Sequence, residues 1–115
     1  MSEDYQGFRR LRKSWEYQRI KQMGCKYSTS HFVLLVAENV VDTSRLGMTV
    51  SRRVGNAVER NRVKRQIREY FRLNRVFFPH INDYSVIAKR GAAQLSSSEI
   101  HSQLKKLFLR SAIKT

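Results

Sequence analysis

A chain of 115 residues with 41% hydrophobic side chains suits one domain with a modest core and is not composed like a disordered tail. Its 23 Lys and Arg against nine Asp and Glu give a net charge of +14, which favours a polyanionic partner over small-molecule substrates. The longest apolar run, residues 32–37, is too short to span a bilayer, and the N-terminus has no signal-sequence pattern. We therefore expect a cytoplasmic protein that does not contact a membrane.

The chain begins with a basic segment. Residues 1–13 are typical of a flexible arm, and they end in a cluster of Arg and Lys. Ser14 is the expected N-cap of a short helix over residues 15–23, and Gly24 is a natural end for that helix. We find no internal repeat or linker, so residues 1–115 form a single predicted domain.

Two strands are predicted next. The apolar run within residues 31–37 indicates a buried strand, and the alternation of apolar and other residues over 46–52 indicates a second one. The polar residues 38–45 between them are expected to form a loop. A loop of this length allows the two strands to pair antiparallel.

A long helix should follow the second strand. Asn56 can cap this helix, and Glu59 can return the hydrogen bond three residues later. The helix is expected to run to about Leu73, before the connection that contains Pro79, the only proline.

The last third predicts a strand and a helix. Residues 84–89 form a third core strand that ends at Gly91, and Ser96 with Glu99 marks another capped helix start. The final helix is expected to bury its apolar face: Ile100, Leu104, Leu107 and Phe108. The order α-β-β-α-β-α, with room for one further strand, predicts an α+β fold in which about three helices pack on one central sheet.

The segment 52–75 carries the most informative charge pattern. It holds nine basic and two acidic residues, so its charge of +7 is half of the total. On a helical wheel, the apolar residues form one stripe, and five polar residues, four of them cations, occupy about 100° of a flank. Arg60, Lys64, Arg68 and Arg72 follow one another at a spacing of four residues, and like charges at this spacing repel each other. A helix that accepts this repulsion is expected to bind an anionic partner that neutralises it. Arginine prevails because its planar fork grips phosphate.

We therefore predict that nucleic acid binds along this helix and the turn that enters it. An ordinary solvated face is the alternative, but such a face intersperses acids with bases. The predicted RNA-binding residues are Arg52, Arg53, Asn56, Arg60, Asn61, Arg62, Lys64, Arg65, Arg68 and Arg72.

The same segment resembles a known family. Residues 55–65, with the core Arg-Asn-Arg-x-Lys-Arg, are similar to the signature of the bacterial ribonuclease P protein subunit. Residues 46–53 and 84–91 resemble the strands that flank this signature in the family. The resemblance covers roughly residues 8–110, and a match set between two matching strands is more specific than a basic run alone.

The resemblance implies a function and a fold. In this family the catalyst is a large RNA, and the protein assists it in removing the 5′ leader of precursor tRNA with Mg²⁺ at the RNA active site. The expected partners are that catalytic RNA and precursor tRNA, with the protein monomeric in the complex. The family also implies a left-handed crossover from the strand near 46–52 through the basic helix to the strand near 84–89.

The resemblance further implies a cleft between the first helix and the sheet that receives the single-stranded leader. The candidate residues for this cleft are Lys13, Tyr17, Lys21, Phe32 and Leu34. Tyr17 is expected either to stack on a leader nucleotide or simply to be a core residue. Many relatives have an aromatic residue where this chain has Lys21, so an ionic contact to the leader is expected there.

Three other classes of protein fit the sequence less well: a protein-only nuclease, a leucine-zipper protein and a small ribosomal protein. A protein-only nuclease requires clustered carboxylates, but the acids are scattered and His31, His80 and His101 lack ligand spacing. The single Cys25 has no disulfide or zinc partner, and we expect it to be a small, partly buried side chain. A leucine-zipper protein requires leucine heptads after the basic helix, and none follow. A small ribosomal protein is the closest rival, since it would share the charge and the size.

Overall fold

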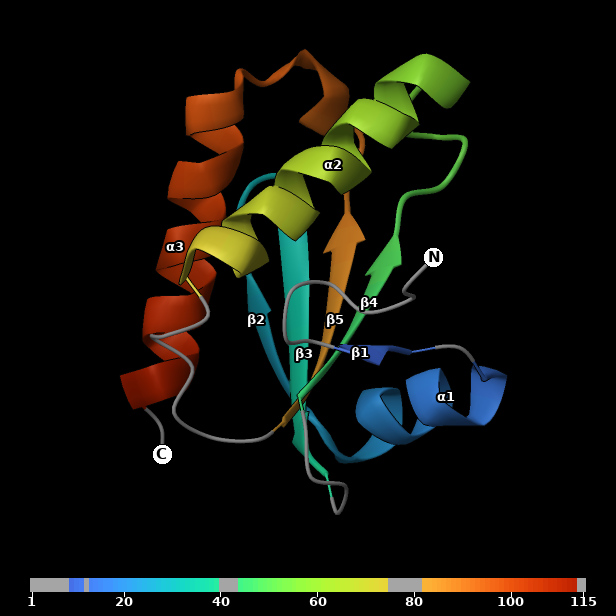
Figure 1. The fold of residues 1–115 in the computed structure, drawn as a ribbon, viewed down its shortest axis with the longest axis vertical. Coiled ribbons are helices and arrows are strands. Elements are labelled where there is room, and N and C mark those ends of the chain that lie inside the picture. The colour runs from blue at the N-terminus through green and yellow to red at the C-terminus, as the bar shows by residue number, and fades with distance from the viewer. Residues whose placement is uncertain (1–8, 12, 40–43, 75–81, 114–115) are drawn as a thin grey trace.

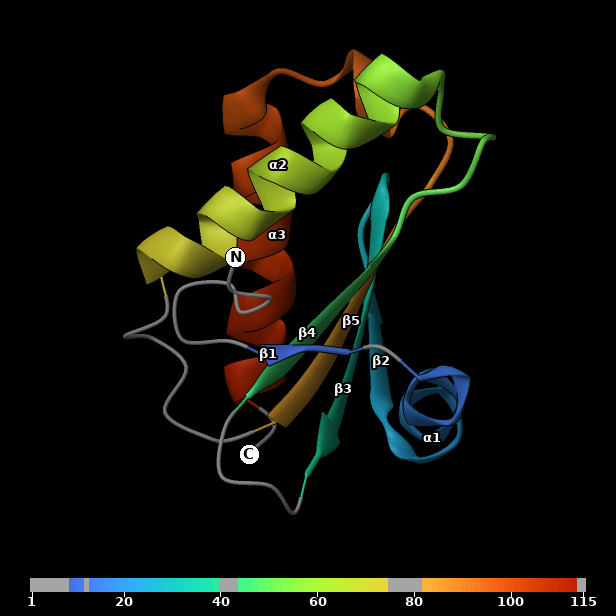
Figure 2. The same ribbon diagram turned by 45° about the vertical axis from the view of Figure 1, so that its right-hand side comes forward.

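The computed structural model describes residues 9–11, 13–39, 44–74 and 82–113, which form a mixed sheet with helices on both faces (Figures 1 and 2). The strands are β1 (Arg9–Arg10), β2 (Cys25–Ser28), β3 (Phe32–Glu38), β4 (Arg45–Thr49) and β5 (Asn82–Ala88). The helices are α1 (Ser14–Met23), α2 (Ala57–Asn74) and α3 (Ser97–Ile113), with a short 3-10 helix η2 (Ala92–Gln94). The predicted α+β class is confirmed, but the sheet has two strands beyond the three predicted, β1 and β2, where room was left for one.

The strand order is β1-β4-β5-β3-β2, with β5 parallel to β4 and antiparallel to β3. The predicted direct pairing of the strands now seen as β3 and β4 is therefore wrong, because β5 lies between them. Strand β5 is buried at six of its seven positions, so it takes the central place where both of its edges are paired. The end of β4 also differs, since it stops at Thr49 rather than at Arg52.

The connection from β4 through α2 to β5 is left-handed. In Figure 1, α2 lies in front of the sheet and β5 stands to the left of β4, with both arrows pointing up. Most parallel crossovers have the opposite hand. The hand that the family resemblance implied is thus the one observed.

One face of the sheet, which we call the α2/α3 face, is covered by α2 and α3 (Figure 2). Within the described segments, its core joins 17 buried residues from strands, turns and both helices. The rings of Tyr70, Phe71, Tyr84 and Phe108 pack together there, and Phe71 meets Phe108 edge-on at a centroid distance of 4.8 Å. The predicted apolar stripes of both helices are confirmed, since all of their residues belong to this core.

The opposite face, which we call the α1 face, holds a much smaller apolar cluster. Its buried members are Leu11, Ile20 and Ala37, and Tyr17 and Leu35 pack against them. Helix α1 supplies Ile20 and Tyr17 and lies across this face (Figure 2).

The predicted flexible arm is wrong for its described residues. Arg9 and Arg10 form β1, parallel to β4, and the Leu11 N–H donates to the Leu46 carbonyl at 3.0 Å. Leu11 is only 1% exposed, because it completes the small cluster beneath α1. Residues 1–8 and 12 lie outside the described residues, as does Pro79 in the connection 75–81.

The boundaries of α1 differ slightly from the prediction. Lys13, rather than Ser14, is the N-cap, and its backbone N–H donates to the Glu16 carboxylate at 2.9 Å. The predicted end is confirmed, because the Gly24 N–H donates to the Ile20 carbonyl at 2.8 Å. Cys25 opens β2 and is exposed, so its expected partial burial is wrong; β2 is an edge strand of the sheet.

Gly91 and the start of α3 are as predicted. Gly91 has a φ of +93°, a left-handed conformation that side chains rarely adopt, and it turns the chain from β5 into η2. Ser96 and Glu99 then form a capping box, in which the Ser96 N–H donates to Glu99 at 2.9 Å and the Glu99 N–H donates to Ser96 at 3.2 Å.

Candidate nucleic-acid interface

Helix α2 begins at a capping box, as predicted. The Glu59 N–H donates to the Asn56 side-chain oxygen at 2.9 Å, and the Asn56 N–H donates to the Glu59 carboxylate at 2.9 Å. Gly55 makes room for this arrangement, since an added Cβ would lie 2.6 Å from a Glu59 carboxylate oxygen. Asn56 is thus tied to the helix start through its backbone and its side chain.

The turn before α2 directs its residues to opposite sides. Val54 is buried in the α2/α3 core, and its N–H donates to the Ser51 carbonyl at 3.0 Å. Arg52 and Arg53, which precede it, are exposed. The buried valine therefore fixes the turn while both predicted RNA-binding arginines face solvent.

One side of α2 faces α3 and η2. The Gln66 side chain hydrogen-bonds the His101 ring at 3.0 Å, and the Arg62 guanidinium donates to the Leu95 carbonyl at 2.9 Å. Arg62 is one of the predicted RNA-binding residues, but its guanidinium is hydrogen-bonded to the backbone at the end of η2. It lies about 200° around the helix from Arg60 and about 60° beyond Arg65, towards the side that faces α3.

The other side of α2 carries what we call the basic flank. Its six residues are Arg60, Asn61, Lys64, Arg65, Arg68 and Arg72. All are exposed or half-buried, and the core stripe separates them from the side that faces α3. The flank therefore presents five cations along more than three turns of a helix that is held from behind by the core, and Glu69 is the acid at its edge.

The end of the flank is partly neutralised. Arg72 pairs with Glu69 one turn earlier, and its Nε donates to a Glu69 carboxylate oxygen at 3.1 Å. The hydrogen bond from Arg72 lowers the pKa of Glu69 below its usual value. The charge of Arg72 is consequently balanced by an acid at the end of the helix.

On the α1 face, Tyr17 has features of both predicted roles, a core residue and a residue that can stack on a nucleotide. Its hydroxyl donates to the Leu11 carbonyl at 3.2 Å, and its ring lies over Gly47, where an added Cβ would be 2.5 Å from a ring carbon. The ring is nevertheless only half-buried. Lys13 and Lys21, the candidates four residues before and after Tyr17, are exposed.

Two leader candidates are wrong. Phe32 and Leu34 have no exposed surface and belong to the core beneath α2 and α3, on the opposite face from α1. Successive side chains of a strand point to opposite faces, so an assignment shifted by one residue selects the wrong face. By this alternation Val33 and Leu35, both half-buried, lie on the α1 face.

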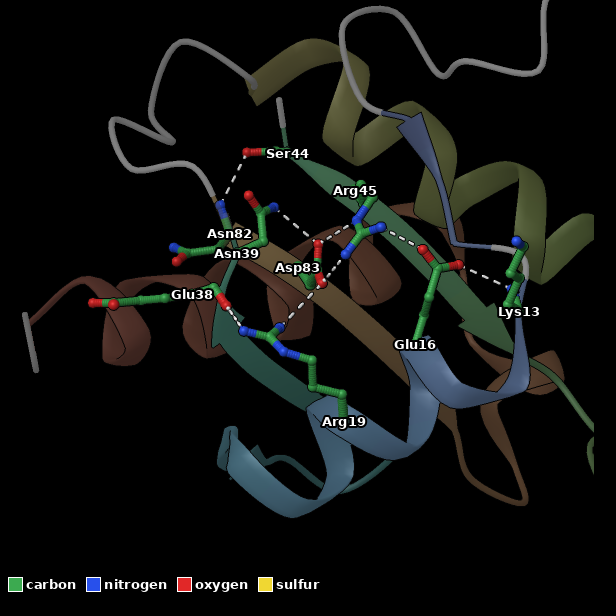
Figure 3. Close-up of polar contacts among 9 residues, drawn as sticks. All are labelled: Lys13, Glu16, Arg19, Glu38, Asn39, Ser44, Arg45, Asn82 and Asp83. Carbon is green, nitrogen blue, oxygen red and sulfur yellow. Dashed lines mark hydrogen bonds and ion pairs between the residues drawn. The ribbon is translucent and has the colours of Figure 1, made fainter. Parts of the chain in front are cut away.

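The sequence prediction also missed four charged residues that lie together beneath α1. Glu16 and Arg19 of α1 meet Arg45 of β4 and Asp83 of β5 (Figure 3). Sequence separations of 29 and 38 residues between hydrogen-bonded partners leave no local pattern to reveal such a group. The one available signal is an acid near the start of a strand that leads into an apolar run, because a buried charge requires a partner.

The described residues contain no group of three His, Cys, Asp or Glu side chains that can hold a metal ion. His31 and His101 are each hydrogen-bonded to a glutamine instead, and His80 lies outside the described residues. Among the helices that the structure describes, none combines the length and the apolar character needed to cross a membrane.

Sequence comparison identifies close relatives. Residues 6–112 match the family described as Ribonuclease P. The chain is 42% identical to the Ribonuclease P protein component of Desulforapulum autotrophicum over 99 residues, 86% of this chain and 85% of that protein. It is 44% identical to that of Syntrophus aciditrophicus over 95 residues, 83% of this chain and 80% of that protein.

Solved structures share the fold. The RNase P protein of Staphylococcus aureus matches with a TM-score of 0.80 and 33% identity, covering 89% of this chain and 94% of that one. The RNase P protein of Thermotoga maritima matches with a TM-score of 0.79 and 32% identity, covering 88% and 96%. The match to the sequence family and the shared fold agree, and this chain belongs to the ribonuclease P protein component family.

Proposed function

We propose that this chain binds the RNA subunit of ribonuclease P through the basic flank of α2 and the turn before it. We further propose that it receives the 5′ leader of precursor tRNA on the α1 face, and so assists removal of the leader. The observation that carries the first part is the division of α2 into three sides. One side packs on the core, one meets α3, and the third holds five cations, of which Arg72 is paired with Glu69.

The physical basis for RNA binding is electrostatic. Five cations along one flank release counterions when they neutralise phosphates, and arginine forks bind phosphate bidentately. Arg52 and Arg53 extend the positive surface beyond the start of the helix, where free backbone N–H groups also favour anions. Arg62 has a different role in this proposal, since it fastens α2 to the loop at Leu95.

The leader contact rests on the residues that α1 and the sheet present together. Tyr17 offers a half-buried ring, and Lys13 and Lys21 offer exposed charges on either side of it. The ring is held over Gly47, so a nucleotide base can stack only on the part that remains exposed. We propose that the apolar residues beside Tyr17 on the leader surface are Val33 and Leu35, in place of the Phe32 and Leu34 predicted from the sequence.

In this proposal the chemistry belongs to the RNA subunit, which uses Mg²⁺. Glu16 and Asp83 are the buried acids nearest to the α1 face, and both are paired with Arg45, which makes them unsuitable as metal ligands. We derive no catalytic step from a metal held by this chain. The proposed partners imply a protein that works in the cytoplasm as a monomer within the complex.

Cleavage of a precursor tRNA at low Mg²⁺ tests the proposed function. A bacterial ribonuclease P RNA is assayed alone, with this protein, and beside the protein alone. We expect strong stimulation of the RNA and no cleavage by the protein alone. Absence of stimulation with two types of RNA subunit, while RNA binding persists, would instead favour a ribosomal or general RNA-binding role.

The basic flank can be tested by one substitution and a matched control. Arg65→Ala removes an exposed cation from the flank, and Lys106→Ala removes an exposed cation from α3. We expect Arg65→Ala to weaken binding to the RNA subunit and to reduce the slope of log K against log salt by about one. Equal salt slopes for the two variants would remove the flank from the interface.

A further inference from the structure

A network of four charges lies where α1 crosses the sheet (Figure 3). Arg45 binds Asp83 through two parallel hydrogen bonds of 2.7 Å, from Nε and Nη2 to the two carboxylate oxygens. Its remaining nitrogen, Nη1, pairs with the Glu16 carboxylate. The Asp83 side chain is fully buried, and it also accepts a hydrogen bond of 2.9 Å from Asn39. The guanidinium thus links β4, β5 and α1 at one point.

Helix α1 contributes two members of this network. Glu16 binds Arg45, and its other oxygen accepts the N–H of Lys13 at the start of the helix. Arg19 donates to the Glu38 carbonyl at 2.7 Å and lies 3.6 Å from an Asp83 oxygen. The four charges sum to zero, so the network does not supply the attraction for RNA. Hydrogen bonding to Asp83 is the main reason that the pKa of Arg45 is raised.

Such a network contributes more to geometry than to stability. Removing charged groups from water costs roughly as much as their pairing returns, whereas breaking one partner of a buried pair is strongly unfavourable. Among the described residues, the buried apolar cluster beneath α1 has three members, Leu11, Ile20 and Ala37, against which Tyr17 and Leu35 pack. A small apolar cluster is compatible with several helix orientations. Arg45 is fixed in the sheet by its bidentate pair with Asp83, and Glu16 binds this fixed guanidinium. Arg19 adds a second tie from α1 to the sheet, through the Glu38 carbonyl and Asp83.

The orientation of α1 decides where the proposed leader residues lie. Tyr17 follows Glu16 directly in the sequence, and Lys21 is two positions after Arg19. A rotation of α1 about its axis, or a tilt away from β4, moves Tyr17 off Gly47 and carries Lys13 and Lys21 with it. The network is therefore coupled to the leader surface through a single short helix.

We propose that Glu16, Arg19, Arg45 and Asp83 are positioning residues for the 5′ leader: they hold α1 at the angle that presents Tyr17, Lys13 and Lys21 to it. This inference rests on the proposed function, and it assigns no contact with RNA to the network itself. It predicts that loosening α1 lowers the preference for precursor over mature tRNA without weakening the basic flank.

A charge-neutral double variant tests the inference. Glu16→Gln/Arg19→Gln removes both members that α1 contributes, and it leaves the net charge and the Arg45–Asp83 pair unchanged. The control, Glu99→Gln/Lys105→Gln, makes the same charge change on α3 and also alters the carboxylate of a capping box. Substituting Arg45 or Asp83 is avoided in the first test, because an unpaired buried charge can unfold the domain.

Three quantities are measured on the full chain with the RNA subunit. They are the affinity for the RNA subunit, the ratio of affinities for precursor and mature tRNA, and the hydrogen exchange of the α1 amides. Quenching of Trp15, the only tryptophan, which lies on α1 and is 56% exposed, provides an independent reading of that helix.

For the α1 variant we expect faster exchange in α1 and a fall of about tenfold in the precursor-to-mature ratio, since small displacements cost large factors in recognition. Affinity for the RNA subunit should stay within about twofold of wild type. The control should match wild type in all three. Retaining Arg19 in a Glu16→Gln single variant should restore part of the ratio.

Two results would overturn the inference. An unchanged ratio would show that the network does not position the leader surface, whether or not α1 loosens. Equal loss of RNA-subunit affinity and of the ratio would show a general folding defect. If instead the wild-type protein shows no preference for precursor over mature tRNA, the proposed leader function itself fails. This failure is distinguished from failure of the positioning inference because it is seen in the wild-type protein, without any substitution.

Discussion

The two faces of the sheet are built in different ways. On the α2/α3 face, 17 buried residues and four packed aromatic rings hold two long helices. On the α1 face, three buried apolar residues and four charges hold one helix of ten residues. The first face resists deformation because close packing tolerates little change in volume, whereas the second depends on directional polar contacts.

The construction of each face suits its proposed partner. A helix that carries a row of like charges needs strong support from behind, which the large core beneath α2 supplies. A helix that presents Tyr17, Lys13 and Lys21 to a leader, as we propose for α1, needs a defined angle but little bulk beneath it. We therefore expect α2 and α3 to unfold with the whole domain and α1 to open first.

The largest expected effect comes from removing apolar volume from the α2/α3 core. Leu104→Ala should lower the free energy of unfolding by about 2–5 kcal/mol, a large share of the stability of a small domain. Ile20→Ala on the α1 face should mainly speed hydrogen exchange within α1 and change the global value less. Denaturant unfolding and amide exchange measure both quantities. Equal global losses would show that the two faces unfold as one unit.

A smaller effect is expected at Gly47, where the sheet meets α1. Gly47→Ala places a methyl group 2.5 Å from the Tyr17 ring, so the ring must move and its hydroxyl loses the Leu11 carbonyl. We expect a loss of about 1–3 kcal/mol from overpacking, together with weaker preference for precursor tRNA. In a double-mutant cycle, Tyr17→Leu should relieve most of the loss. Strict additivity of the two substitutions would contradict the proposed clash.

Alkaline pH should act on the α2/α3 face through its buried tyrosines. Burial raises the pKa of Tyr70 to about 12 and that of Tyr84 above its usual value. Because the unfolded tyrosine loses its proton near pH 10, the contribution is complete below that pH and is lost as pH rises towards 12. For Tyr70 the loss at pH 11 is on the order of 1 kcal/mol.

Denaturant unfolding of wild type and Tyr70→Phe between pH 9 and 11 checks this expectation. The free energy of unfolding should fall less steeply with pH in the variant than in wild type, because phenylalanine has no proton to lose at that position. Parallel declines would assign the alkaline sensitivity to other groups.

The smallest effect is expected at the start of α1. Lys13 occupies the N-cap but has no side-chain acceptor for the helix N–H groups, so Lys13→Asn should stabilise α1 by up to about 1 kcal/mol. Slower exchange of the α1 amides should reveal the gain, with little change in the global free energy. If Lys13 also contacts the leader, precursor binding should weaken at the same time. A gain in both properties would exclude Lys13 from the leader surface.

Local features of the sequence were sufficient for much of the fold. The capping boxes at Asn56 and Ser96, the apolar stripes of α2 and α3, and the glycine after β5 each depend on residues within one or two turns of each other. The basic flank is of the same kind, because helical spacing alone places its cations on one side. Its function in RNA binding remains a prediction.

Features that depend on contacts between residues far apart in the sequence could not be predicted from local patterns. The place of β5 between β3 and β4 depends on competition for the most buried strand, and the hand of the crossover came from family resemblance. The face to which Phe32 points is set by the register of β3 against β5. Arg45 and Asp83 became partners because β4 and β5 pair in parallel, which a polar residue at a strand end does not reveal.

The central position of β5 also has a consequence for how the protein is made. The ribosome synthesises β3 and β4 before α2 and delivers β5 only afterwards, so the middle of the sheet is the last strand to emerge. Until then the inner edges of β3 and β4 lack the strand that pairs with them in the folded protein, and exposed edges invite aggregation. The β1–β4 and β2–β3 pairs can form earlier, but they can join into one sheet only after β5 has left the ribosome.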